Sequence, residues 1–114
     1  MKKISQTQTK KEGNRMLTKE KVIEALKNVI DWEIGADVVS LGLIYDVTFP
    51  KEDTVHVLMT LTTPGCPLVY SLVAQVEQEV KKLGVKNVEV EITYDPPWDP
   101  SRMSPELKRR FGME

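Results

Sequence analysis

The sequence predicts a two-layer α/β domain of the α+β type, in which two helices cover one face of a small mixed sheet and an extended C-terminal tail follows. Two stretches carry apolar residues at helical spacing, and three shorter stretches alternate apolar with polar residues, in the order α-β-β-α-β. Each helix then has one apolar stripe and the sheet has one apolar face, so both helices are expected on the same side. The expected division is a leader at 1–15, the domain at 16–93 and the tail at 94–114.

The first helix is expected from Leu17 to Ile30, ending near Asp31. Thr18 is a residue type that caps helix N-termini, and Leu17 can pack on the first apolar residue as a hydrophobic staple. The apolar stripe follows the spacing i, i+3, i+4, i+7 and i+8, and consists of Val22, Ala25, Leu26, Val29 and Ile30.

Two strands are expected next, at Leu41–Phe49 and Thr54–Thr62, with a turn at 50–53 between them. The short connection predicts an antiparallel hairpin. In the first strand Leu43, Tyr45 and Val47 are expected on one face. In the second strand one face is apolar, and the other is more polar and contains the only histidine, His56.

A second helix is expected at 67–83 and a third strand at Val85–Thr93, with Gly84 as the left-handed C-cap of the helix. The second strand, this helix and the third strand can form a right-handed crossover that makes the two strands parallel. The helix stripe is Val69, Leu72, Val73, Val76, Val80 and Leu83.

The tail, Tyr94 to Glu114, begins with a proline-rich stretch at 95–100 that fits neither a helix nor a central strand. Trp98 lies inside this stretch, and a tryptophan in a proline-stiffened segment is expected to anchor the segment on the domain. Ser104 is expected to cap a short helix at Pro105–Arg110, which Gly112 ends.

Composition and charge exclude several classes of protein. The chain has 114 residues and a net charge of −1, which argues against a nucleic-acid binder with a broad basic surface. Residues 1–15 carry five basic residues and one acidic residue, a net +4, so the rest carries −5. This leader is expected to be disordered and has no apolar core of a secretory signal, and Met16 is an alternative first residue. No apolar run is long enough for a membrane span.

Cys66 is the only cysteine, which excludes a disulfide within the chain and a zinc site made of four cysteines. A lone thiol fits a reducing compartment, so a cytoplasmic protein is expected. Pro67 tolerates the first position of a helix and disfavours helical geometry in the residue before it, which places Cys66 at the N-cap of the second helix. There the helix dipole would favour the thiolate and lower the pKa of Cys66. The alternative is a small buried apolar residue.

A second candidate site consists of the acidic residues Asp31, Glu33 and Asp37, which follow the expected first helix at the unfavourable end of its dipole. These carboxylates could ligate a hard cation or orient a partner. The alternatives are solvated loop acids, or Asp37 capping a following turn. The hydroxyls of Thr62 and Thr63 are expected near the Cys66 thiol as polar contacts, whereas His56 lies too far along its strand to act as its base.

Three ordered motifs resemble the metal–sulfur (iron–sulfur) cluster assembly factors, a family of SufT-like and PaaD-like domains, over residues 17–112. The motifs are Asp31-Trp32-Glu33-Ile34-Gly35 with Val38-Val39-Ser40-Leu41-Gly42-Leu43-Ile44, Leu61-Thr62-Thr63-Pro64-Gly65-Cys66-Pro67, and Tyr94-Asp95-Pro96-Pro97-Trp98 with Arg102-Met103-Ser104. Many members have Pro where this chain has Trp32, and the cysteine-rich C-terminal region of PaaD proteins has no counterpart here.

This resemblance implies the small iron–sulfur cluster assembly fold and a non-enzymatic role in assembling or delivering clusters. The family's reactive cysteine corresponds to Cys66, and its acidic motif corresponds to Asp31 and Glu33. Pro67 and Trp98 lie in the other matching motifs and are binding candidates with the acidic and threonine residues. The implied partners are assembly proteins, client apoproteins or a second copy, with neither nucleic acid nor membrane.

One thiolate cannot hold a cluster that needs four protein ligands. Iron or a cluster would therefore be held transiently and with shared ligands, and no permanently bound cofactor is expected. The further ligands could come from a second subunit, a partner, a small thiol or the nearby carboxylates. Two other functions fit the residues: a thiol-dependent enzyme with Cys66 as nucleophile, and an adaptor that binds through the acidic loop and the Trp98 tail.

Overall fold

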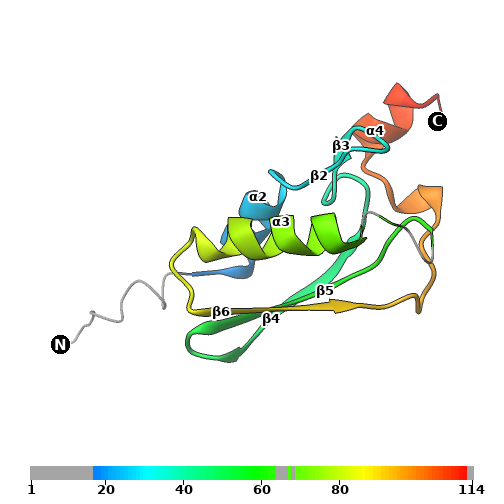
Figure 1. Ribbon diagram of the computed structural model, residues 1–114. Helices are drawn as coiled ribbons and strands as arrows, with labels where there is room; N and C mark the ends of the chain where they lie inside the picture. The colour runs from blue at the N-terminus through cyan, green and yellow to red at the C-terminus, as the bar shows by residue number, and fades with distance from the viewer. Residues whose placement is uncertain (1–16, 64–66, 68, 113–114) are drawn as a thin grey trace.

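The computed structural model describes residues 17–63, 67 and 69–112, and the expected leader at 1–15 lies outside this part of the chain. Helices α2 (Lys19–Leu26) and α3 (Val69–Lys81) lie over one face of the three-stranded sheet (Figure 1), which confirms the predicted two-layer α/β fold. The strands are β4 (Ile44–Lys51), β5 (Thr54–Met59) and β6 (Asn87–Ile92).

The sheet has the order β4-β5-β6, so the most apolar strand lies at its centre. Strands β4 and β5 form the predicted antiparallel hairpin, and β5 and β6 are parallel, as expected for a crossover through α3. Helix α3 packs mainly against β6, and α2 packs against β4 and α3. None of the helices in the described residues has the length and apolar character needed to cross a bilayer.

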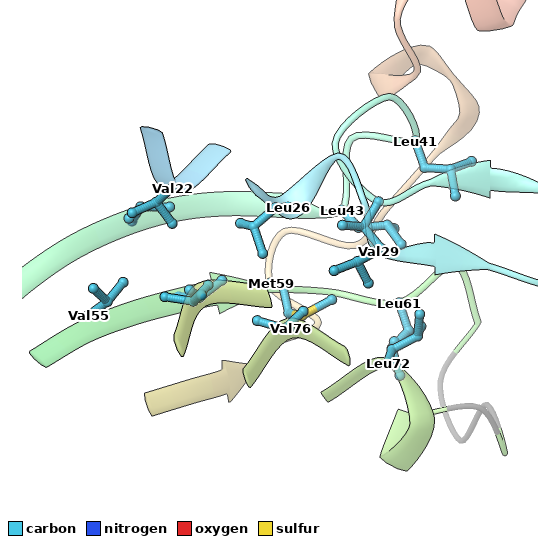
Figure 2. Packing of buried hydrophobic residues seen from close by; sticks show 14 of the residues in the cluster. Val22, Leu26, Val29, Leu41, Leu43, Val55, Met59, Leu61, Leu72 and Val76 are labelled. Atoms are coloured by element: carbon cyan, nitrogen blue, oxygen red, sulfur yellow. The ribbon is translucent and has the colours of Figure 1, made fainter. Parts of the chain in front are cut away.

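The core fills the space between the helices and the sheet (Figure 2). The helices, β4, β5 and the loops beside them supply its buried side chains, while β6 contributes only half-buried ones. The fully buried set includes Val22, Leu26, Val29, Leu43, Val47, Val55, Val57, Met59, Leu72, Val76 and Val80. Leu83, which the periodicity assigned to the apolar stripe of α3, lies beyond the end of that helix and is 39% exposed. The helix ends at Lys81, and Leu83 lies in the turn that leads to the left-handed Gly84, so the helical spacing no longer holds there.

The first helix is shorter than predicted. Thr18 caps α2 as expected, since its side chain accepts a hydrogen bond from the backbone N–H of Lys21. However, α2 ends at Leu26 instead of near Asp31, and a turn follows in which the N–H of Val29 donates to the carbonyl of Leu26 at 3.0 Å. Val29 remains fully buried after this turn. Its burial preserves the apolar spacing although the helix has stopped.

A two-stranded ribbon that the sequence did not predict follows this turn. It consists of β2 (Ile30–Asp31) and β3 (Ala36–Asp37), which pair antiparallel. Strands of two residues are too short to show an alternating pattern, so periodicity cannot reveal them.

The main strands also differ from their expected bounds. Strand β4 begins at Ile44 and continues through Pro50 to Lys51, so the turn is shorter than expected. Its register against β5 is irregular between Ile44 and Asp46. Such an irregularity redirects a side chain, and Tyr45 does not join Leu43 and Val47 in the core. Its hydroxyl instead donates to the carbonyl of Pro96 in the tail at 2.8 Å.

The tail folds back over the loop that precedes β4. It contains the 3-10 helix η1 (Pro100–Arg102) and the helix α4 (Pro105–Arg110), which Ser104 caps by accepting from the N–H of Leu107. The N–H of Ser104 donates to the carbonyl of Ser40 at 2.7 Å, and Leu107 is buried in the core.

The tail passes so close to Gly42 that no side chain fits there. Gly42 has φ +78°, and a Cβ at this position would overlap the carbonyl group of Arg102. Gly35 has a similar φ of +82°, but a Cβ there would meet nothing. Comparing substitutions at the two positions therefore separates the energetic cost of backbone strain from that of steric overlap with the tail.

We predict that Gly35→Ala lowers the free energy of unfolding by about 1–2 kcal/mol, from backbone strain alone. Gly42→Ala should cost at least about 1 kcal/mol more, because the tail must move away from the loop. Urea unfolding followed by circular dichroism measures both losses. Equal losses in the two variants would show that the contact between Gly42 and the tail contributes nothing.

Candidate functional site

The loop between β5 and α3 carries the candidate thiol. The described chain ends on one side at Thr63 and resumes at Pro67, so Cys66 itself lies outside the described residues, and its expected N-cap position stays a prediction. Pro67 is exposed and lies in a turn, whereas it was expected as the first residue of the helix. The described part of α3 begins at Val69.

Both ends of this loop are held by core side chains. Leu61, just before the loop, and Leu72, in the first turns of α3, are buried in the same cluster, as Figure 2 shows. Thr62 is half-buried and Thr63 is exposed. The loop is therefore presented at the carboxyl end of the central strand, which is where ligands bind in open α/β sheets.

The β2–β3 ribbon is attached to α3 by one side chain, Gln75. Its amide nitrogen donates to the carbonyl of Ile30 and its amide oxygen accepts from the N–H of the same residue, each at 3.3 Å. Gln75 thus satisfies the free edge of β2 as a neighbouring strand would. Sequence reasoning missed this residue. Its only local signal is a long polar side chain beside the apolar stripe, and such a signal does not identify a partner 45 positions away.

The three acidic residues lie in and around this ribbon, and two of them stabilise its loops. Asp31 is 2% exposed, and its carboxylate accepts from the N–H of Glu33 at 3.0 Å. Asp37 accepts from the N–H of Ser40 at 2.9 Å and so caps the following turn, one of the alternatives that the sequence left open. Glu33 is exposed. Among the described residues, no three His, Cys, Asp or Glu side chains converge as metal ligands.

A cavity of about 550 Å³ lies between the ribbon and α4. Asp37 and Ser40 line one side, and Ser104 and Leu107 line the other. Arg110 borders the cavity, and its guanidinium donates to the carbonyl of Gly35 at 3.3 Å. The structure thus brings Asp37 together with the tail, a proximity that the sequence did not indicate.

Trp98 has a structural contact that accounts for its place in the tail. Its indole N–H donates to the carbonyl of Leu41 at 2.7 Å, and the ring is half-buried against the core. The guanidinium of Arg102 lies 5.0 Å from the centre of the Tyr45 ring, next to the Tyr45–Pro96 hydrogen bond.

Asp99, the residue after Trp98, accepts hydrogen bonds from the hydroxyl and the N–H of Ser101. These bonds hold the pKa of the Asp99 carboxyl below its usual value.

His56 has a partner on the sheet. Its ring nitrogen lies 3.0 Å from the carboxylate of Glu91 on the neighbouring strand β6. This contact is on the face of the sheet that the helices do not cover, since the alternate residues Val55 and Val57 are buried beneath the helices.

Two aromatic side chains adjacent to the candidate motifs are exposed. Trp32, between β2 and β3, is 72% exposed, and Tyr70, in the first turn of α3, is 85% exposed. Tyr70 lies off the apolar stripe of α3, so helical spacing agrees with its exposure, although sequence reasoning did not single it out.

A comparison with known protein families finds a match that spans both the ribbon and the Cys66 loop. The model of the family described as "iron-sulfur cluster assembly protein" matches residues 19–92, from the start of α2 to the end of β6. The chain belongs to this family. The match includes the acidic ribbon and the Cys66 loop, and it stops before the tail.

Three curated relatives cover most of the domain. The Fe-S protein maturation auxiliary factor YitW of Bacillus subtilis is 41% identical, over 84% of this chain and 95% of its own length. The Fe-S protein maturation auxiliary factor SufT of Staphylococcus aureus is 38% identical, over 75% of this chain and 98% of its own. An iron-sulfur cluster carrier protein of Synechocystis is 41% identical over 72% of this chain, which corresponds to only 23% of that larger protein.

A solved structure of a conserved hypothetical protein from Thermotoga maritima has the same fold. It is 59% identical, with a TM-score of 0.73, and the match covers 84% of this chain and 95% of that protein. The resemblance to SufT-like assembly factors that the motifs indicated is thereby confirmed.

We predict that Asp31→Ala lowers the free energy of unfolding by about 1–3 kcal/mol, because a buried loop loses the acceptor for the N–H of Glu33. Glu33→Ala should change it by less than about 0.5 kcal/mol, because the side chain is exposed. Urea unfolding followed by circular dichroism compares the two variants. If the losses were equal, the carboxylate of Asp31 would not support the ribbon.

We also predict that Trp98→Phe costs about 1–3 kcal/mol, because the carbonyl of Leu41 loses its donor. The matched control is Trp32→Phe, which changes the exposed tryptophan and should cost less than about 0.5 kcal/mol. Thermal unfolding of both variants tests this, and the fluorescence of the Trp32→Phe protein should report a tryptophan shielded from water. A spectrum typical of an exposed tryptophan would contradict the docked tail.

Proposed function

We propose that this protein is an iron–sulfur cluster assembly or targeting factor that acts through the thiol of Cys66. The observation that carries the proposal is the family match across α2 to β6, which contains the Cys66 loop. The names of the relatives agree with it, because two are maturation auxiliary factors and one is a cluster carrier. None of these names describes an enzyme, so a delivery role is favoured over catalytic turnover.

The chemistry of the thiol limits how iron or a cluster is held. A cluster needs about four protein ligands, and the chain has one cysteine. No group of three candidate ligands exists among the described residues. The cargo would therefore share its remaining ligands with a partner protein, a second copy or a small thiol. Incomplete ligation by one chain makes release to a client apoprotein favourable.

The N-cap position predicted for Cys66 would favour its thiolate. Cys66 precedes α3, a helix of 13 residues whose first turn has no acidic residue among those described. If Cys66 occupies the N-cap that the sequence predicts, the positive end of the helix dipole would favour its thiolate, with no opposing carboxylate in that turn. We expect a lowered pKa for Cys66, so that the thiolate is present at neutral pH and can ligate iron.

We propose that residues around the Cys66 loop and the ribbon contact partner proteins or support the contact surface. Glu33, Thr63 and Pro67 are exposed around the loop and the ribbon, where assembly proteins or client apoproteins would contact them. Asp31, Asp37, Thr62 and Trp98 are at least half-buried, and we assign them the task of holding the contact surface in shape. We place this activity in the cytoplasm, where a single thiol stays reduced.

Anaerobic reconstitution with iron and sulfide tests the proposal. The wild-type protein should develop a visible absorbance that Cys66→Ser lacks, because the serine hydroxyl is a poor iron ligand. The control Thr48→Ala, on an exposed position of β4, should behave as wild type. Circular dichroism must show that Cys66→Ser is folded.

The other outcomes identify other roles. An identical spectrum in Cys66→Ser would overturn the role of the thiol as a ligand. Loss of folding in that variant would make Cys66 a structural residue. Turnover of a substrate without metal would identify a thiol-dependent enzyme, and partner capture that survives Cys66→Ser but needs Trp98 would identify an adaptor.

A further inference from the structure

Strand β6 forms one edge of the sheet (Figure 1). On one side it pairs with β5 along its whole length. On the other side no strand in the described residues pairs with it. An unpaired strand edge presents a row of backbone donors and acceptors to any extended chain.

Two hydrogen bonds show which residues present these groups. The N–H of Asn87 donates to Asp53 at 3.0 Å, and the N–H of Thr93 donates to Met59 at 2.9 Å, so both residues direct their backbone toward β5. Backbone direction alternates along a strand. Val88, Val90 and Ile92 therefore direct their N–H and C=O groups outward, at the open edge.

The two edges of the sheet differ in protection. Strand β4, the other edge, contains Pro50 and two irregularities in register, which are devices that hinder the addition of a strand. Strand β6 contains no proline, and its register against β5 is continuous. Both outer edges lack a partner strand among the described residues, and only the β6 edge is regular.

The side chains of β6 give this edge two different faces. Glu89 and Glu91 are exposed on the face that the helices leave uncovered. Glu91 contacts His56, and Glu89 has no ion-pair partner among the described residues. On the helix side, Val88, Val90 and Ile92 are half-buried and pack at the border of the core. A strand added here would have acidic neighbours on one face and apolar neighbours on the other.

We propose that the β6 edge binds, as an added strand, an extended segment of a partner protein whose side chains alternate between basic and apolar. Basic side chains would lie beside Glu89 and Glu91, and apolar side chains would extend the core beside Val88 and Ile92. A second copy of this chain fits poorly, because pairing β6 with itself brings glutamates opposite glutamates. This site is independent of Cys66 and of the proposed cluster chemistry.

An alternating Lys–Val peptide tests the proposal on the full chain. The peptide should bind saturably and slow the hydrogen exchange of the outward amides of Val88, Val90 and Ile92. A Lys–Val peptide that is N-methylated at the pairing positions should not bind, because it cannot donate the strand hydrogen bonds. Equal binding by the methylated peptide would overturn strand addition.

Charge reversal tests the acidic face. The double variant Glu89→Lys with Glu91→Lys should weaken binding of the Lys–Val peptide about tenfold or more, because two attractive neighbours become repulsive. It should gain affinity for a Glu–Val peptide. The matched control is Glu20→Lys with Glu24→Lys on α2, which changes the net charge equally but lies on the helix that packs against β4. If both double variants lost the same affinity for the Lys–Val peptide, the loss would be an effect of net charge alone, and the proposed site on β6 would be wrong.

Two further results would show that the β6 edge binds something other than a partner protein. Concentration-dependent dimerisation that protects the same three amides would make a second copy the occupant. Peptide binding that appears only after deletion of residues 2–15 would make the basic leader of this chain the occupant. Cys66→Ser should leave all these measurements unchanged, which keeps the outcome separate from that of the cluster experiment.

Discussion

The structure depends on the burial of the central strand β5 beneath two helices. Val55, Val57 and Met59 are fully buried there, and they contact side chains contributed by α2, α3 and the neighbouring strands. Because β5 pairs antiparallel with β4 and parallel with β6, the chain must cross over the sheet through a helix between β5 and β6. That crossover creates the loop with Cys66 at the carboxyl end of the central strand.

The same end of the sheet gathers two segments that are distant in sequence. The β2–β3 ribbon is joined to α3 through Gln75, and the tail is joined to the preceding loop through Trp98. Gly42 permits this arrangement, since only a residue without a side chain lets the tail pass at Arg102. The candidate site is therefore composed of short segments on a packed core, an arrangement common among binding sites.

The three acidic residues in and around the ribbon differ in what their carboxylates do. Asp31 and Asp37 use their carboxylates to hold backbone N–H groups, whereas Glu33 faces solvent. The acidic motif at Asp31 and Glu33 thus contains one residue that shapes the loop and one that is exposed. The sequence left open whether each carboxylate is a ligand or a cap, because both roles leave the same local pattern.

The sequence alone determined the order and type of the main elements, because apolar periodicity is a local property that reports the buried face of a helix or strand. The Thr18 and Ser104 caps were readable for the same reason, and three ordered motifs were specific enough to indicate the family. Only the tertiary structure decided that Asp31 and Asp37 belong to a ribbon and where the tail docks on the domain. These features depend on hydrogen bonds between residues far apart in the chain, such as Gln75 with Ile30 and Trp98 with Leu41, and no local pattern encodes such partners.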